Sequence, residues 1–273
     1  MIEFLSSPLF LHALCTLALA SLASGLIGSY VVSFDISLIA GSISHSLLGG
    51  IGLSLFLTHT LGRELFSPLL GALITALLAS FLIASLNNMK HKMKGPILAA
   101  IWSLGMSLGL IFFSKTPNFG IDLSHFLAGN ILFISQEELS LLLFLDLLIL
   151  LFVLLFHTRF VQIGFDLRQA LLQRLPVKGL YFLLIFLIAL SVVILMYAVG
   201  ILLTITMLLL PPAIGRVHAI TMKEMMFKTI IFSFLLSFIG LGIAYMWNLP
   251  VGATIGLTIS LLFFVCAPKQ VKG

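Results

Sequence analysis

Long stretches without a charged side chain restrict the fold of this 273-residue chain more than any other feature. Six stretches lack Lys, Arg, Asp and Glu, and they cover 4–34, 36–62, 65–89, 96–114, 179–215 and 229–268. A helix needs about 20 apolar residues to cross a bilayer. The last two stretches therefore hold two helices each, which we expect to turn at 248–250 and near 197–200. With a weaker run around Asp146, the pattern predicts an all-α polytopic membrane helix bundle of eight or nine transmembrane helices.

The composition agrees with a membrane protein. Apolar residues make up 61% of the chain and the mean hydropathy is +1.26, whereas soluble domains contain about 45–50% apolar residues. The spans leave no room for a large soluble domain. We therefore predict one transmembrane domain over 1–273.

Basic residues predict the orientation of the spans. Twelve of the 14 Lys and Arg residues fall in 90–94, 159–178, 216–228 and 269–272, and the others are Arg63 and Lys115. Lys and Arg collect in cytoplasmic loops, so nine spans would place the N-terminus outside and the C-terminus inside. The net charge of +5 then reflects topology and requires no nucleic-acid partner.

The sequence carries no motif for an enzyme of the common classes. It lacks the phosphate loop G-x-x-x-x-G-K-[ST], the patterns H-E-x-x-H and G-x-S-x-G, and Cys/His spacing typical of zinc sites. We expect no catalysis by this chain and no permanently bound cofactor. The classes of function that remain are a transporter and a membrane scaffold without transport.

His45 is the first candidate functional residue, because it lies within the charge-free stretch 36–62. Gly41 and Gly49 lie four residues away on either side, so the imidazole should project from a helix face with little bulk. An ionisable group at membrane depth indicates a functional site. The alternative is a hydrogen bond between helices that only helps packing.

Asp146 is the second deep ionisable residue, inside the run 139–156. A carboxyl group at membrane depth would need a cation or a hydrogen-bond donor beside it, which makes Asp146 a candidate functional residue. The alternative, which the acidic neighbours Glu137 and Glu138 favour, is a position near the outer membrane interface.

Small residues and prolines mark expected helix contacts. Ala20, Ser24 and Gly28 form one ladder at helical spacing, and Ser42, Ser46 and Gly50 form another; such ladders allow close helix packing in lipid. The pair at 211–212, both proline, should interrupt an apolar run and free backbone carbonyls, which lipid tolerates only where they are buried or line a cavity. Either a gate element or a simple kink would explain it.

Several motifs, in order along the chain, resemble the permease subunits of zinc, manganese and iron ABC importers. They are Gly-Ser-Tyr-Val-Val at 28–32, Ser-Leu-Ile-Ala-Gly-Ser-Ile-Ser-His-Ser-Leu-Leu-Gly-Gly at 37–50, Leu-Ala-Gly-Asn-Ile-Leu at 127–132, Phe-Asp-Leu-Arg-Gln-Ala at 165–170, Val-Gly-Ile-Leu-Leu at 199–203 with Leu-Pro-Pro-Ala at 210–213, and Leu-Pro-Val-Gly-Ala-Thr-Ile at 249–255. The chain departs from the family pattern where Gly41 replaces an aspartate and where Gly49-Gly50 replaces Pro-Gly.

The resemblance implies a permease in the bacterial cytoplasmic (inner) membrane that moves a divalent metal ion as its substrate. Its implied partners are ATP-binding cassette subunits, an extracytoplasmic metal-binding protein, and a second permease, either another copy or a paralogue, within membrane lipid. His45 would contact the metal, and Asp146 could replace the carboxylate that Gly41 lacks. An imidazole without a carboxylate favours zinc over manganese or iron. The alternative function is a secondary transporter, which repeated broken helices would support; the sequence shows no such repeat.

The segment 161–178 is the predicted cytoplasmic coupling loop. Asp166 can cap a short helix on which Leu167, Ala170, Leu171 and Leu175 form an apolar stripe, with Arg168 and Arg174 beside it. The resemblance implies that Asp166, Ala170, Leu171 and Arg174 belong to the helix that docks on the ATPase. The alternative is an amphipathic helix lying on the membrane surface.

Overall fold

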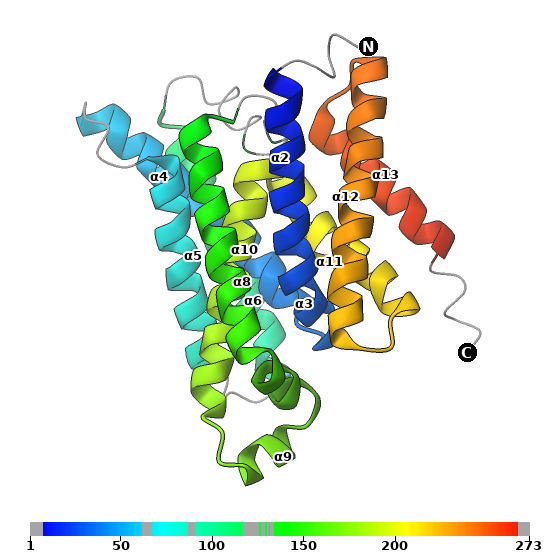
Figure 1. The fold of residues 1–273 in the computed structure, drawn as a ribbon. Helices are drawn as coiled ribbons and strands as arrows, with labels where there is room; N and C mark the ends of the chain where they lie inside the picture. Colours follow the sequence, from blue (N-terminus) through cyan, green and yellow to red (C-terminus); the bar gives the residue numbers. More distant parts are fainter. Residues whose placement is uncertain are drawn as a thin grey trace. The chain divides into compact units, whose positions relative to one another are not determined.

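Helices make up the described part of the protein (Figure 1). The computed structural model describes residues 8–61, 67–86, 91–116, 126, 129, 131 and 134–266. The helices are α2 (Pro8–Ala23), the π-helix η1 (Ser24–Gly28), α3 (Ser29–Ser33), α4 (Ser37–Leu61), α5 (Pro68–Ser85), α6 (His91–Phe113), α8 (Gln136–Phe165), α9 (Leu167–Leu172), α10 (Val177–Val199), α11 (Ile201–His218), α12 (Met222–Trp247) and α13 (Val251–Cys266). The basic segment 269–272 and Lys90 lie outside the described residues.

The all-α membrane bundle predicted from the sequence is confirmed. Eight helical segments of the described chain are long and apolar enough to cross a membrane, and one of them runs through α2, η1 and α3 as Phe10–Ser33. The apolar α13 has 16 residues, which is about 24 Å at the helical rise and shorter than a usual span.

Both predicted turns between spans are confirmed. Gly200, with φ of 84°, separates α10 from α11. Asn248, with φ of 51°, ends α12. Glycine and asparagine tolerate this left-handed backbone better than other residues, so two apolar runs become four helices.

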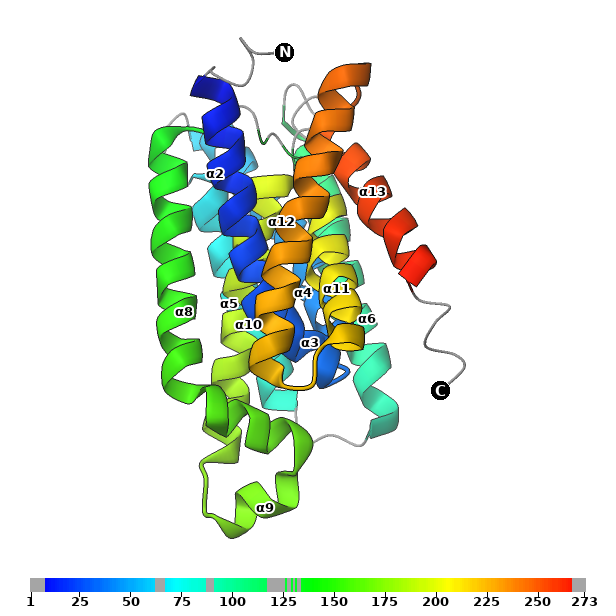
Figure 2. The same ribbon diagram turned by 45° about the vertical axis from the view of Figure 1, so that its right-hand side comes forward.

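Contacts divide the chain into two compact units. The first contains 1–35, 125–154 and 194–273, and the second contains 36–124 and 155–193. In the first unit, α11, α12 and α13 pack together, and α12 also lies along α2 and η1 (Figures 1 and 2). The prediction of one transmembrane domain over 1–273 stays a prediction.

In the second unit, α4 packs against both α5 and α6. Glycines allow these backbones to meet: a Cβ added at Gly49 would lie 3.0 Å from the Gly105 carbonyl oxygen, and one added at Gly50 would collide with the Gly71 carbonyl. Ser46 lies against Gly105 in turn. The predicted small-residue ladder on α4 therefore does bring neighbouring helices close.

Candidate functional site

His45 lies in the middle of α4 and stacks on an aromatic side chain of α6. Its ring lies 4.2 Å from the Trp102 ring, centroid to centroid, with 5° between the two planes. The side chain is half-buried, and its Nδ1 is buried without a hydrogen-bond partner among the residues that the structure describes. A buried polar atom without a partner costs free energy. In one tautomer this nitrogen is a hydrogen-bond donor, and in the other it offers the lone pair with which an imidazole binds a metal ion.

A neighbouring helix occupies part of the face around His45, where Trp102 of α6 covers one side of the imidazole. The indole was missed in the sequence, although it is a large aromatic residue among small ones in α6, where Ser103, Gly105, Ser107 and Gly109 follow. Periodicity along α4 identifies a face of that helix. It cannot identify which residue of another helix packs on that face.

The two glycines that flank His45 have different roles. Gly49 lies against the Gly105 carbonyl, so its missing side chain serves helix packing. At Gly41 an added Cβ would meet only the Trp102 ring, at 3.9 Å, which is ordinary van der Waals contact. The position at which the family carries an aspartate therefore has room for a Cβ atom.

Asp146 is completely buried in the first unit. Its exposed fraction is 0%, and neither carboxylate oxygen has a hydrogen-bond partner in the described part of the chain. It lies ten residues, or about three turns, beyond the start of α8 at Gln136. The carboxylate is therefore enclosed by protein about three turns into the helix. The position near the outer membrane interface, which Glu137 and Glu138 favour, stays a prediction.

His45 and Asp146 belong to different units, and each remains a candidate by itself. In the described ranges, no three His, Cys, Asp or Glu side chains lie close enough to hold a metal ion together.

The proline pair lies within α11, which continues to His218, so it does not end the helix. Proline has no backbone N–H, so Pro211 and Pro212 remove the usual helical donors to the carbonyls of Met207 and Leu208. The Ser24 hydroxyl of η1 donates a hydrogen bond to the Met207 carbonyl oxygen at 2.5 Å. The first freed carbonyl is therefore satisfied by a side chain from another helix.

The second freed carbonyl, of Leu208, faces Gly28. A Cβ added at Gly28 would lie 2.5 Å from this oxygen and 2.7 Å from Cγ of Pro212. Both carbonyls thus lie inside the protein, as an apolar bilayer requires. Ser24 and Gly28, two residues of the predicted ladder, therefore form the face of η1 that packs against the proline pair of α11.

Within the predicted coupling segment, residues 167–172 form the short helix α9, while 161–165 end α8 and 177–178 begin α10. Asp166 caps α9, because its Oδ1 accepts a hydrogen bond of 2.9 Å from the Gln169 backbone N–H. Figures 1 and 2 show α9 beyond the ends of α8 and α10, the helices that it connects. The cap that the sequence predicted for this helix is confirmed.

The apolar stripe of α9 does not form one exposed face. Ala170 is fully buried and Leu175 is half-buried, whereas Leu167 and Leu171 are 51% and 58% exposed. Ala170 is therefore a packing residue of this loop and cannot itself contact a partner. Arg174, with φ of 56°, is exposed at the turn that follows.

Known proteins resemble this chain over nearly its whole length. A "Probable metal transport system membrane protein" of Chlamydia pneumoniae is 41% identical over 265 residues, covering 96% of this chain and 89% of the relative. The "Manganese transport system membrane protein MntC" of Listeria monocytogenes is 29% identical, covering 94% and 90% of the two chains. A solved chain of PsaBC from Streptococcus pneumoniae, in complex with a Fab, has a TM-score of 0.84 at 27% identity and covers 97% of this chain and 93% of its own.

The chain also matches the sequence model of one transporter family over nearly its whole length. The sequence model of the ABC 3 transport family matches residues 6–270, a range that includes His45, the proline break and the coupling segment. The chain therefore belongs to the ABC 3 transport family, whose members are membrane permeases of metal ABC transporters.

Proposed function

We propose that this chain forms the translocation path of an ATP-driven importer for a divalent transition metal, with His45 as a ligand that the ion meets in transit. The observation that carries the proposal is the Nδ1 atom of His45. It is buried without a partner in the described chain, on a helix long and apolar enough to cross a membrane. Family membership supports transport as the activity. A path ligand must also release the ion, and one imidazole binds a metal ion more weakly than the four-ligand site of a structural zinc.

Zinc is the proposed ion. Imidazole suits zinc, whereas carboxylate oxygen suits manganese, and Gly41 removes the carboxylate that would stand one turn from His45. Manganese is the second candidate, because a relative from Listeria carries manganese transport in its name. Asp146 is a second candidate ligand, since its carboxylate has no partner within the described chain.

The proposed complex contains ATP-binding cassette subunits, an extracytoplasmic metal-binding protein and two permeases in a bacterial cytoplasmic membrane. The solved PsaBC chain and the family support partners of this kind. The exposed leucines of α9 would dock on the ATPase. Closure of the ATPase pair would then move the helices attached to α9, which are α8 and α10.

The test is metal uptake into proteoliposomes that contain the permease with its ATPase and metal-binding protein. We expect ATP-dependent uptake of radiolabelled zinc that exceeds uptake of manganese at equal concentration. Preference for manganese would select the second candidate. Uptake that persists with a catalytically inactive ATPase would instead indicate a secondary transporter.

A further inference from the structure

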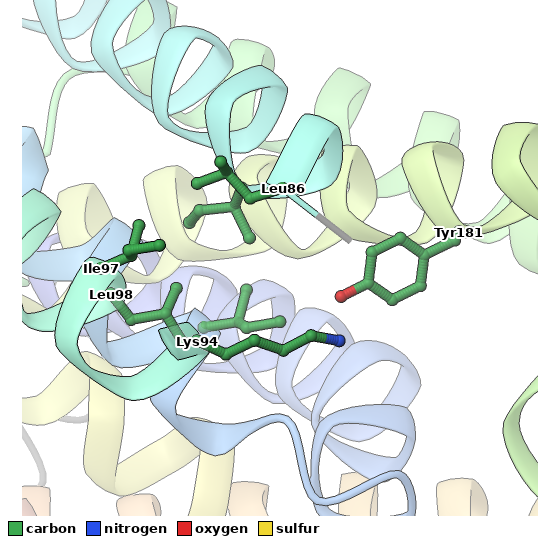
Figure 3. Close-up of a pocket in the computed structure, with 7 residues that line it drawn as sticks. Leu86, Lys94, Ile97, Leu98 and Tyr181 are labelled. Atoms are coloured by element: carbon green, nitrogen blue, oxygen red, sulfur yellow. The ribbon is translucent and has the colours of Figure 1, made fainter. Parts of the chain in front are cut away.

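A crevice in the second unit lies at one end of four helices (Figure 3). Its volume is about 30 Å³, which is room for about two water-sized groups. Its lining residues come from α4, α5, α6 and α10: Ile39, Ile83, Leu86, Lys94, Ile97, Leu98 and Tyr181. Five of these seven side chains are aliphatic, and the other two carry an ammonium and a phenol hydroxyl.

The two polar groups lie on the same side of the crevice. Figure 3 shows the Lys94 ammonium and the Tyr181 hydroxyl directed to one region, with Leu86, Ile97 and Leu98 on the other side. Lys94 stands in the basic segment 90–94, and Tyr181 follows the start of α10 by one turn. The positive-inside rule assigns both segments to the cytoplasmic interface.

The chemistry of the lining restricts the occupant. A lysine ammonium repels a divalent cation, so the crevice does not suit the transported metal. Aliphatic walls offer no hydrogen bonds to a small hydrated anion, and burying an anion without partners is costly. An occupant that fits both the polar side and the aliphatic walls of the crevice has an anionic group next to an apolar body.

We propose that this crevice binds an anionic phospholipid of the cytoplasmic leaflet. A phosphate oxygen of the headgroup enters the space beside Lys94 and accepts a hydrogen bond from the Tyr181 hydroxyl. The acyl chains lie outside this small space, along the apolar surface of the helices that line it. Basic pockets between transmembrane helices on the cytoplasmic side are suited to anionic headgroups.

The test measures lipid binding to the purified full-length protein in detergent by native mass spectrometry. Phosphatidylglycerol and phosphatidylcholine with identical acyl chains are added in turn. We expect tighter binding of phosphatidylglycerol, and Lys94→Gln should weaken that binding about fivefold, the effect of one basic residue at an anionic surface. Tyr181→Phe should weaken it less, whereas Lys94→Arg should retain it.

A matched control removes the same charge elsewhere. Lys115→Gln changes an exposed lysine just beyond the opposite end of α6, and we expect lipid binding to stay at the wild-type level. Equal losses of lipid binding in Lys94→Gln and Lys115→Gln would mean that only the overall charge of the protein matters. Unchanged binding in Lys94→Gln would mean that Lys94 does not contact the lipid. Either result would overturn the proposed site.

A competition experiment distinguishes a lipid from a soluble anion. Glycerol phosphate, at the lipid concentration, should not displace phosphatidylglycerol, because it lacks the apolar body. Displacement would overturn the proposal in favour of a small-anion site. These measurements need no metal transport, so they can fail independently of the proposed importer function.

Discussion

At the scale of single residues, the transport proposal depends on His45. We expect His45→Ala to lower metal uptake by at least about tenfold, which corresponds to about 1.4 kcal/mol, because the alanine cannot bind the ion. His59→Ala is the matched control, since His59 lies on the same helix but is exposed. Uptake of radiolabelled metal by the assembled complex checks both variants, and wild-type uptake in His45→Ala would remove this residue from the path.

Gly41 allows the ion preference itself to be tested. Gly41→Asp should fold, because an added Cβ meets only Trp102 at 3.9 Å, and should raise manganese uptake relative to zinc severalfold by supplying a carboxylate. Gly49→Asp is the steric control, since its Cβ would press on the Gly105 carbonyl, and we expect poor assembly. An unchanged ratio of manganese to zinc in a well-folded Gly41→Asp complex would contradict the proposed proximity of residue 41 to the ion.

At the scale of elements, the contact between η1 and α11 joins two irregular helices. Ser24→Ala would leave the Met207 carbonyl unsatisfied and should lower the free energy of unfolding by about 1–3 kcal/mol. Pro211→Ala restores the backbone N–H that can bond this carbonyl. The double variant should therefore lose less stability than Ser24→Ala alone, measured by thermal unfolding in detergent.

Ser21→Ala serves as the control for this cycle. The Ser21 hydroxyl bonds the Leu17 carbonyl four residues earlier in its own helix, so its loss leaves the helical bond of that carbonyl in place. Additive effects of Ser24→Ala and Pro211→Ala would show that the serine does not compensate for the proline.

A separate prediction concerns α9, the proposed coupling helix. Leu171→Glu should reduce both copurification of the ATPase and metal-stimulated ATP hydrolysis, because an unpaired carboxylate buried in an interface is strongly unfavourable. Gln173→Glu, at an exposed polar position, should have little effect. Ala170→Glu should instead damage the loop, since Ala170 is buried. Normal assembly and hydrolysis in Leu171→Glu would support the alternative of a helix on the membrane surface.

At the scale of the whole molecule, the orientation in the membrane can be tested with single cysteines. In a chain without Cys15 and Cys266, Lys115→Cys should react with an impermeant thiol reagent on intact cells, because Lys and Arg asymmetry places that loop outside. Gln169→Cys, at an exposed position of α9, should react only after the membrane is permeabilised. The opposite labelling pattern would reverse the topology.

The sequence alone determined the all-α membrane fold, both turns between long apolar runs, the cap at Asp166 and the family. These features depend on local chemistry: apolar length, the left-handed backbone of Gly200 and Asn248, and motifs read along the chain. Tertiary structure decided what distant helices supply to one another. It placed Trp102 on His45, Ser24 on the carbonyl freed by Pro211, and Ala170 inside its loop. It also enclosed Asp146 in protein, because packing between helices is fixed by side-chain shape in three dimensions, which helical periodicity along one segment does not encode.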